Sequence, residues 1–317
     1  MPDTTKMIIG SRGSKLALWQ AEWVKSQLLA GGYQVEIRTI KTTGDKMVDA
    51  PLPDSGVKGL FIKEIEEALI AGVVDLAVHS LKDLPNDQPD GLQVAAVPER
   101  ADARDVLVSR EAKLFANLPP GARVGTSSLR RKSQAGYLRR DLEIIPVRGN
   151  LDTRLKKLER GDYDALIMAA AGLHRLGFQD RITQYFSTTE MCPAVGQGAL
   201  AIEIRKGDER IARAVGPLDH APTHAAIRAE RSTLRRLGGG CQLPIAAHAI
   251  AEEDCLRMRG VVASPDGTKM IHATAPGFIN DPETLGATVA ESLLSQGALS
   301  ILDLVKAKHS HTEHPSK

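Results

Sequence analysis

Two long stretches of the chain repeat one pattern, a short apolar segment followed by an amphipathic helix, and this repetition limits the fold to the α/β classes. In the first stretch, strand patterns alternate with helix patterns at residues 7–11, 15–30, 34–41, 60–71 and 73–79. In the second, the same alternation runs through residues 123–127, 129–139, 143–148, 151–160 and 165–171. Such alternation predicts parallel sheets covered by helices on both faces.

From about residue 219 the pattern changes. A helix pattern at 223–237 ends at three consecutive glycines, and strand patterns follow at 245–250, 255–263 and 270–275. Pro265, Asp266 and Gly267 favour a hairpin between the last two strands. Residues 285–305 then have the spacing of one long helix. This part is predicted to be a small α+β unit with a three-stranded antiparallel sheet.

Two segments are candidates for crossing between the α/β units. Residues 97–110 are rich in charge and lie between the units, and residues 193–198 read PAVGQG before a strand pattern at 199–204. The second segment is either a crossing that returns the chain to the first unit or a surface turn. We therefore expect two doubly wound βα domains and a C-terminal α+β domain, with boundaries at 1–98 plus 199–217, 99–198 and 218–317.

The charge of the chain is concentrated in one block. The formal net charge is only +2, yet residues 121–160 contain eight arginines and three lysines against four acidic residues. Such a block suggests an anionic ligand, either nucleic acid or a polycarboxylate or phosphate. Against nucleic acid, Tyr137 is the sole aromatic residue among these arginines. We therefore expect a small anionic ligand and no nucleic-acid partner.

Composition also bears on the cellular compartment. The three cysteines, Cys192, Cys241 and Cys255, lack the spacing of a disulfide framework, which favours a reducing environment. No secretory signal pattern is evident at the start, and the longest apolar run, 165–173, is too short to cross a bilayer. The expectation is a cytoplasmic protein without a membrane partner. The histidines of the polar C-terminal residues are read as a frayed tail, and no metal site is expected.

Polar residues gather where the strands of the first unit end. Ser80, Lys82 and Asp83 follow one strand, and Arg12 and Ser14 follow another. In open α/β sheets, ligands bind outside the carboxyl ends of strands. Asp83 is a candidate for steering protons or stabilising a cation. The alternative is that Asp83 only forms the turn before Leu84 and Pro85.

The second unit offers hydroxyls and arginines at equivalent places. The N-terminus of a helix can bind an anion, because its backbone N–H groups are free to donate and the helix dipole favours negative charge there. If both Arg130 and Arg131 reach one ligand, that ligand must be large or bear several anionic groups, because adjacent helical residues point about 100° apart. The alternative is a capped helix with solvated arginines. The candidate residues here are Thr126, Ser127, Ser128, Arg130, Arg131, Arg148 and Arg154.

Two further segments are candidates. The glycine-rich 56–61 follows a long polar stretch and suggests a flexible lid with Lys58 and Phe61 at its edge. The spacings of a P-loop and of a dinucleotide fingerprint are absent. Cys241 follows three glycines on a loop past a helix end, where a ligand can approach closely. It is either a covalent attachment point or nucleophile, or an inert loop cysteine.

Together, seven segments closely resemble the porphobilinogen deaminase family, in the family's order and spacing. They are RGSKLAL at 12–18, KGLFIKEIE at 58–66, DLAVHSLKDLP at 75–85, GTSSLRR at 125–131, VRGNLDTRL at 147–155, PAVGQGAL at 193–200 and GGGCQLPI at 238–245. The resemblance covers most of the chain. A departure is Ala246, where the family often has glycine.

The resemblance implies a transferase of tetrapyrrole biosynthesis. Cys241 would hold a dipyrromethane cofactor through a thioether, and four porphobilinogen molecules would be added head to tail, each losing ammonia, before water releases hydroxymethylbilane. Asp83 would be the catalytic residue. Substrate and cofactor binding would fall on Arg12, Ser14, Lys58, Phe61, Ser80, Lys82, Thr126, Ser127, Ser128, Arg130, Arg131, Arg148, Arg154 and Gln197. The family also implies a monomer.

The main alternative is a non-enzymatic anion- or solute-binding protein. The first two domains of the family are similar to the lobes of periplasmic binding proteins, which have two βα units around a cleft. Such a protein would need neither Asp83 nor Cys241.

Overall fold

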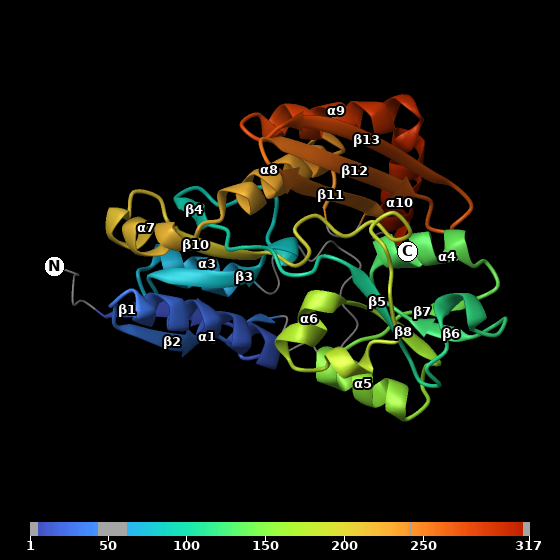
Figure 1. The fold of residues 1–317 in the computed structure, drawn as a ribbon, viewed down its shortest axis with the longest axis horizontal. Coiled ribbons are helices and arrows are strands. Elements are labelled where there is room, and N and C mark those ends of the chain that lie inside the picture. The colour runs from blue at the N-terminus through green and yellow to red at the C-terminus, as the bar shows by residue number, and fades with distance from the viewer. Residues whose placement is uncertain (1–5, 44–61, 241–242, 313–317) are drawn as a thin grey trace, which may run out of the picture.

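The computed structural model describes residues 6–43, 62–240 and 243–312 of the 317-residue chain (Figure 1). Its strands form three sheets: β2-β1-β3-β10-β4, β7-β6-β8-β5-β9 and β11-β12-β13. The first two are five-stranded and the third has three strands. The C-terminal sheet with its helices lies above the other two in the view of Figure 1. The predicted mixed α/β class, with a C-terminal antiparallel sheet, is confirmed.

The first sheet is built around β1 (Met7–Ser11), which pairs in parallel with β2 (Val35–Thr39) and β3 (Leu76–Ser80). Helix α1 (Lys15–Ala30) follows β1, and Ser14 caps it by accepting from the amide of Ala17. Its apolar side packs with α7 (Glu209–Val215) on one face of the sheet, whereas α3 (Lys63–Ile70) packs on the other. The predicted helix at 60–71 begins outside the described residues.

The second sheet has the same plan. The strand β6 (Arg123–Gly125) pairs in parallel with β7 (Glu143–Ile145) and β8 (Ala165–Ala169). Helix α4 (Leu129–Leu138) packs on one face, and α5 (Leu151–Glu159) and α6 (Ala170–Arg175) pack on the other. The strand predicted at 165–171 is two residues too long, because α6 begins at Ala170. The edge strand β9 (Gln184–Tyr185) completes the sheet.

Neither sheet is purely parallel, which corrects the sequence interpretation. In the first sheet β10 (Leu200–Arg205) is antiparallel to both β3 and β4 (Leu92–Ala96), and in the second β5 (Asp105–Ser109) is antiparallel to β8. Each of these strands enters its sheet directly from a segment that has crossed from the other one. No helix intervenes to reverse the direction of the chain, so the strand runs opposite to its neighbour.

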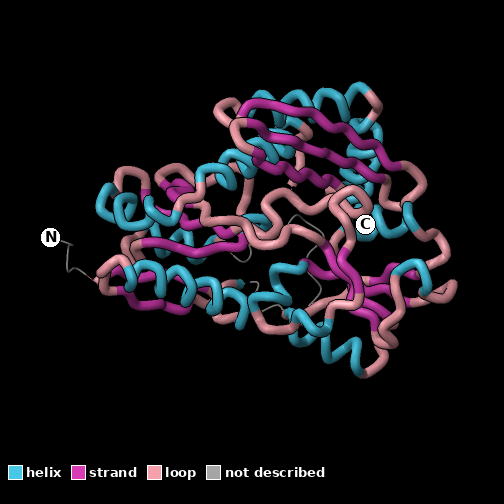
Figure 2. The backbone as a smooth tube through the Cα atoms, viewed as in Figure 1, coloured by secondary structure: helices cyan, strands magenta, loops and turns pink. Residues whose placement is uncertain are grey.

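The two crossing segments lie side by side (Figure 2). The amide of Ala101 donates to the carbonyl of Gly198 at 3.3 Å, and Arg100 Nε donates to the carbonyl of Gln197 at 2.8 Å. The prediction that the chain returns to the first sheet after 193–198 is confirmed by β10. The interpretation of 97–110 as connection alone was wrong, because β5 occupies its second half; its alternating apolar residues, Val106 and Val108, face one core while Leu107 faces the other.

The third sheet consists of β11 (Ile245–Glu252), β12 (Cys255–Ala263) and β13 (Met270–Phe278), all antiparallel. Helix α8 (Ala221–Arg236) and the C-terminal helices cover one face and form one apolar core with it. The other face meets Cys192, which packs with Ala246 and Val261. The C-terminal sheet is therefore fixed to the segment that precedes the second crossing.

The predicted single helix over 285–305 was wrong. The chain forms α9 (Pro282–Ser295) and α10 (Ala298–Thr312), bent by 82° at the break. Gly297 has φ +91°, a conformation that favours glycine, and its amide donates to the carbonyl of Leu294. Within the described residues no single helix is long and apolar enough to cross a membrane; only this bent pair reaches that length and composition.

Candidate active site

The turn after β3 carries the candidate residues Lys82 and Asp83. It is a single 3-10 turn, η1 (Leu81–Asp83), with Leu81 buried beneath it. The amide of Leu81 donates to the carbonyl of Ala199 at 3.1 Å. Gly196 packs directly on Leu81 at φ +71°, so that a side chain there would collide with it. The second crossing segment therefore fixes the turn that presents Asp83.

Four of the sequence candidates line one pocket at the end of the first sheet. Arg12 and Ser14 come from the end of β1, and Ser80 and Asp83 come from the end of β3. Buried Gln20 of α1 also lines the pocket and donates to the hydroxyl of Ser80 at 2.8 Å. Gln20 was not singled out from the sequence. Its place on α1, six residues beyond the helix cap Ser14, was the one feature that could have indicated it.

The charge of Asp83 acts on cations from both sheets. Burial and repulsion by Arg131 lower the pKa of Lys82 to about 8, against the opposing effect of Asp83. Burial also lowers the pKa of Arg154 to about 10, again with repulsion by Arg131 and an opposing effect of Asp83. Asp83 is therefore within electrostatic range of α4 and α5, so the end of the first sheet faces the end of the second.

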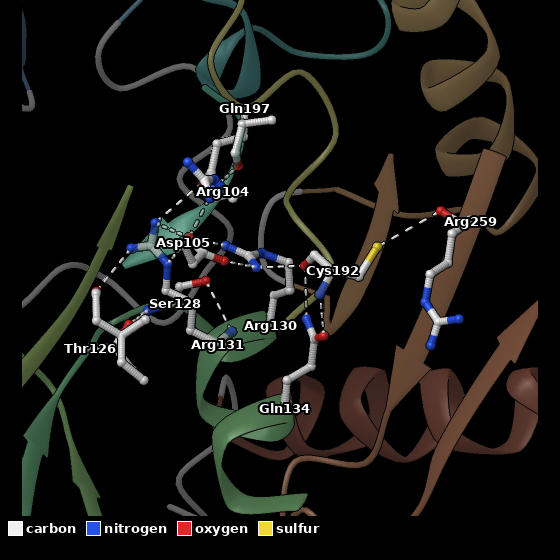
Figure 3. Close-up of polar contacts among 12 residues, drawn as sticks. Arg104, Asp105, Thr126, Ser128, Arg130, Arg131, Gln134, Cys192, Gln197 and Arg259 are labelled. Atoms are coloured by element: carbon white, nitrogen blue, oxygen red, sulfur yellow. Dashed lines mark hydrogen bonds and ion pairs between the residues drawn. The ribbon is translucent and has the colours of Figure 1, made fainter. Parts of the chain in front are cut away.

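Arg130 and Arg131 do not turn to solvent, because Asp105 binds both of them (Figure 3). Arg130 Nη1 lies 2.6 Å from one carboxylate oxygen, and Arg131 Nε lies 2.9 Å from the other. All three residues are at most 6% exposed. Burial alone would raise the pKa of Asp105, but the two arginines lower it to about 2. The sequence led us to expect an anionic ligand beside these arginines, and the carboxylate of Asp105 supplies part of that negative charge from within the protein.

Gln197 belongs to the same buried network. Its amide nitrogen donates to Asp105 at 2.9 Å and to the carbonyl of Ala103 at 2.7 Å, and its oxygen accepts from Arg131 at 3.2 Å. Gln197 is fully buried. It ties the second crossing to β5 and α4. Asp105 itself was missed by the sequence analysis, and its one signal was an acid opening the alternating segment DVLVS.

The three hydroxyls before α4 are already used within the protein. Ser128 caps the helix by accepting from the amide of Arg131, and its own amide donates to Thr126 Oγ1 at 3.2 Å. Ser127 exchanges two hydrogen bonds with the backbone of Val147, at 2.6 and 3.1 Å. These contacts hold the start of α4 to the segment that follows β7 and fix the direction of the arginines.

Arg154 has bonding capacity left. Its Nε donates to the carbonyl of Gly149 at 2.8 Å, and no residue in the described part of the chain accepts from its two terminal nitrogens. Arg148 lies exposed on the preceding turn. A desolvated guanidinium with two undirected donors fits a ligand with carboxylate groups, and so does the desolvated ammonium group of Lys82.

Three candidates cannot be placed. Lys58, Phe61 and Cys241 lie outside the described residues. The other two cysteines are not bridged: Cys192 is buried and Cys255 is exposed. Burial raises the pKa of Cys192 to about 12, which makes it a poor nucleophile. Within the described residues, no group of three histidines, cysteines or acids is arranged to hold a metal.

The fold and the site define a class of protein: an α/β protein with two facing βα sheets whose ends present a carboxylate among cations, suited to a ligand with several carboxylates. Two family descriptions match the chain: "Porphobilinogen deaminase, dipyromethane cofactor binding domain" over residues 7–213, and "Porphobilinogen deaminase, C-terminal domain" over residues 224–295. The chain belongs to the porphobilinogen deaminase family.

Individual relatives agree with the family match. The porphobilinogen deaminase of Syntrophotalea carbinolica is 51% identical over 93% of this chain and 94% of its own length. Those of Syntrophobacter fumaroxidans and Moorella thermoacetica are both 50% identical, over 93% and 95% of this chain and 96% of each relative. Among solved structures, a substrate-binding domain of a Streptococcus pneumoniae amino acid transporter covers 68% of this chain and 93% of its own, at 15% identity and TM-score 0.42.

Proposed function

We propose that this protein is an active porphobilinogen deaminase, the hydroxymethylbilane synthase of tetrapyrrole biosynthesis. It would join four porphobilinogen molecules head to tail with loss of ammonia and release hydroxymethylbilane by hydrolysis. The observation that carries the proposal is the position of Asp83, a carboxylate that lines the pocket and lies in the field of Lys82, Arg131 and Arg154. The relatives described above are named for this activity, and the chain matches nearly their whole length.

The residues present suit a dipyrromethane cofactor. Arg154 has two terminal nitrogens without an acceptor among the described residues, and Lys82 is desolvated, so each of them can bind a carboxylate. When bound through Cys241, this group supplies the pyrrole carbon to which substrate is joined. Arg12 and Ser14 would bind substrate carboxylates at the first sheet, and Lys82, Arg148 and Arg154 would bind carboxylates between the sheets.

Asp83 would stabilise positive charge on the substrate. Loss of ammonia leaves a cationic methylene-pyrrole, and a carboxylate held at the pocket wall is oriented before that charge develops. Arg130, Arg131 and Gln197, bound to Asp105, would act as a rigid support whose net positive charge attracts the anionic chain. Thr126, Ser127 and Ser128 would keep the start of α4 in place, and Ser80 would be oriented by Gln20.

The remaining assignments are part of the same proposal. The three sheets suggest domains at 1–98 plus 199–217, 99–198 and 218–317; Lys58 and Phe61, which belong to the first, lie outside the described residues. The unbridged Cys192 and Cys255 are in keeping with a cytoplasmic location, and the family implies a monomer.

The test is the intact mass of the purified protein from cells that make porphobilinogen. The expected result is a covalent increment of two linked pyrroles that is absent from Cys241→Ser and retained in Cys255→Ser. The second variant is the matched control, because Cys255 is also a thiol but is exposed on β12. An unmodified mass for the unchanged protein would rule out the covalent cofactor.

A further inference from the structure

Three ionisable side chains lie buried directly behind the pocket. Glu66 comes from α3, His79 from β3 and Glu203 from β10, and these elements pack against one another (Figure 1). Their exposed fractions are 8%, 6% and 0%. None of them was a candidate from the sequence. Charge in such a place is weakly screened, so the number of protons in the cluster affects its surroundings.

The contacts within the cluster leave one carboxyl oxygen without a partner. His79 Nε2 lies 3.1 Å from Glu203 Oε2, and Gln88 donates to Glu203 Oε1 at 3.0 Å. Glu66 Oε1 is buried and has no hydrogen-bond partner among the described residues. Two carboxylates therefore face one imidazole. Both can be ionised only at a high cost, because at least one negative charge would be uncompensated.

The resulting balance favours a proton on Glu66 near neutral pH. Burial and, to a smaller extent, repulsion by Glu203 raise the pKa of Glu66 to about 7, against the opposing effect of His79. The other charged group of β10 close to α3 is Arg205, which donates to the carbonyl of Leu69 and is paired with Asp75 and Asp208. The strand β1 brings no ionisable residue to this face of the sheet. Glu66, His79 and Glu203 thus set the local charge.

The cluster is linked to the pocket through its own residues. His79 lines the pocket together with Arg12, Ser80 and Asp83, and so does Ile65, the neighbour of Glu66 on α3. His79 also directly precedes Ser80 at the end of β3. A change of charge at Glu66 is therefore transmitted to the wall on which substrate carboxylates would bind.

We propose that Glu66, His79 and Glu203 are positioning residues for the reaction: together they hold a proton behind the pocket, and its loss places a net negative charge there that weakens binding of a substrate with carboxylate groups. The inference rests on the proposed function, since it concerns binding of porphobilinogen. The site adds a dependence on pH to a pocket whose other charged lining residues are Arg12 and Asp83.

The first test compares Glu66→Gln with Glu67→Gln. Glu67 lies on the same helix, is 61% exposed and pairs only with Lys63 among described residues, so it is a matched control for the loss of one carboxylate. In the unchanged protein and in Glu67→Gln, KM for porphobilinogen should rise on the order of fourfold between pH 6 and 7.5, as expected for one group titrating near 7. In Glu66→Gln, KM should not change over this pH range. A KM profile of Glu66→Gln parallel to that of the unchanged protein would overturn the inference.

The second test needs no substrate. The pKa of Glu66 is raised from its ordinary value of 4.5 to about 7 on folding. The folded protein therefore loses stability as the pH rises between these two values, because the unfolded chain ionises there and the folded state resists ionisation. The Tm of Glu66→Gln relative to the unchanged protein should therefore increase across this range, whereas that of Glu67→Gln should not. A constant difference for Glu66→Gln overturns the inference alone. Absence of any turnover of porphobilinogen would overturn the proposed function, and the inference with it.

Discussion

Arg100 and Glu230 form an ion pair that joins the first crossing segment to helix α8, with 2.5 Å between Arg100 Nη1 and Glu230 Oε1. Glu230 is fully buried, and it also accepts from the amides of Gly196 at 2.7 Å and Ala249 at 2.9 Å. One carboxylate therefore binds both crossings and the third sheet. Because Gly196 packs on the turn of Asp83, this pair also supports the catalytic candidate from behind.

Replacing Glu230 by Gln should destabilise the protein strongly. The guanidinium of Arg100 would lose its counter-ion in a place where water cannot replace it, at a cost of about 3 kcal/mol in the free energy of unfolding. Urea denaturation followed by circular dichroism measures this. The control is Glu283→Gln, which breaks the exposed pair with Arg228 and should cost less than about 1 kcal/mol. An equal loss in the free energy of unfolding for the two variants would show that the buried pair stabilises the protein no more than an exposed one.

Asp105 should be as important for stability as any residue of the site. Asp105→Asn leaves Arg130 and Arg131 side by side without an anion, and we expect a loss of about 3 to 5 kcal/mol. Asp162→Asn, which removes an exposed partner of Arg160, should cost less than about 1 kcal/mol. Adding a small polycarboxylate should recover part of the Tm of Asp105→Asn, because the ligand restores negative charge. No recovery at any concentration would indicate that the arginines cannot be reached by ligands.

The difference between the sequence expectations and this site has a physical cause. The strand-end rule placed Arg12, Ser14, Ser80 and Asp83 correctly at one pocket, because the carboxyl ends of neighbouring parallel strands meet at one edge. The partner of Arg130 and Arg131 could not be predicted in the same way. Asp105 reaches them only because β5 enters the second sheet antiparallel to β8, a pairing that local periodicity does not reveal.

The same limit applies to the buried groups. Glu66, Glu203 and Glu230 were not singled out from the sequence, because only the packing of distant elements encloses them. The break between α9 and α10, by contrast, had a local signal in Gly297 that the apolar spacing on either side obscured.

Lys82 should destabilise the folded state at neutral pH. Its pKa is lowered from 10.5 to about 8, so the charged form is disfavoured on folding below pH 8, and this cost disappears as the pH rises from 8 to 10.5. In a Cys241→Ser background, where no thioether can form, Lys82→Met should therefore raise the Tm at pH 7 and have little effect at pH 10.5. Lys132→Met, at an exposed position of α4, should show no such dependence. A pH-independent effect of Lys82→Met would mean that Lys82 is not desolvated.

Asp83→Asn should largely abolish formation of hydroxymethylbilane while the protein stays folded. The amide keeps the shape of the side chain, but it cannot offset positive charge on the substrate, and loss of such a group typically costs a factor of about 100 to 1,000 in kcat. Asp83 is exposed at the pocket, so removing its charge should leave the Tm nearly unchanged. Asp87→Asn changes an exposed acid four residues further along the chain, so it is the matched control and should retain full turnover.

The measurement is the initial rate of hydroxymethylbilane formation. The mass increment at Cys241 is confirmed for each variant, so that a failure to acquire the cofactor is not mistaken for slow chemistry. If Asp83→Asn carried the cofactor and kept a near-normal rate, the positive charge would have to be stabilised elsewhere, and the site contains no other carboxylate among the described pocket residues that could do so.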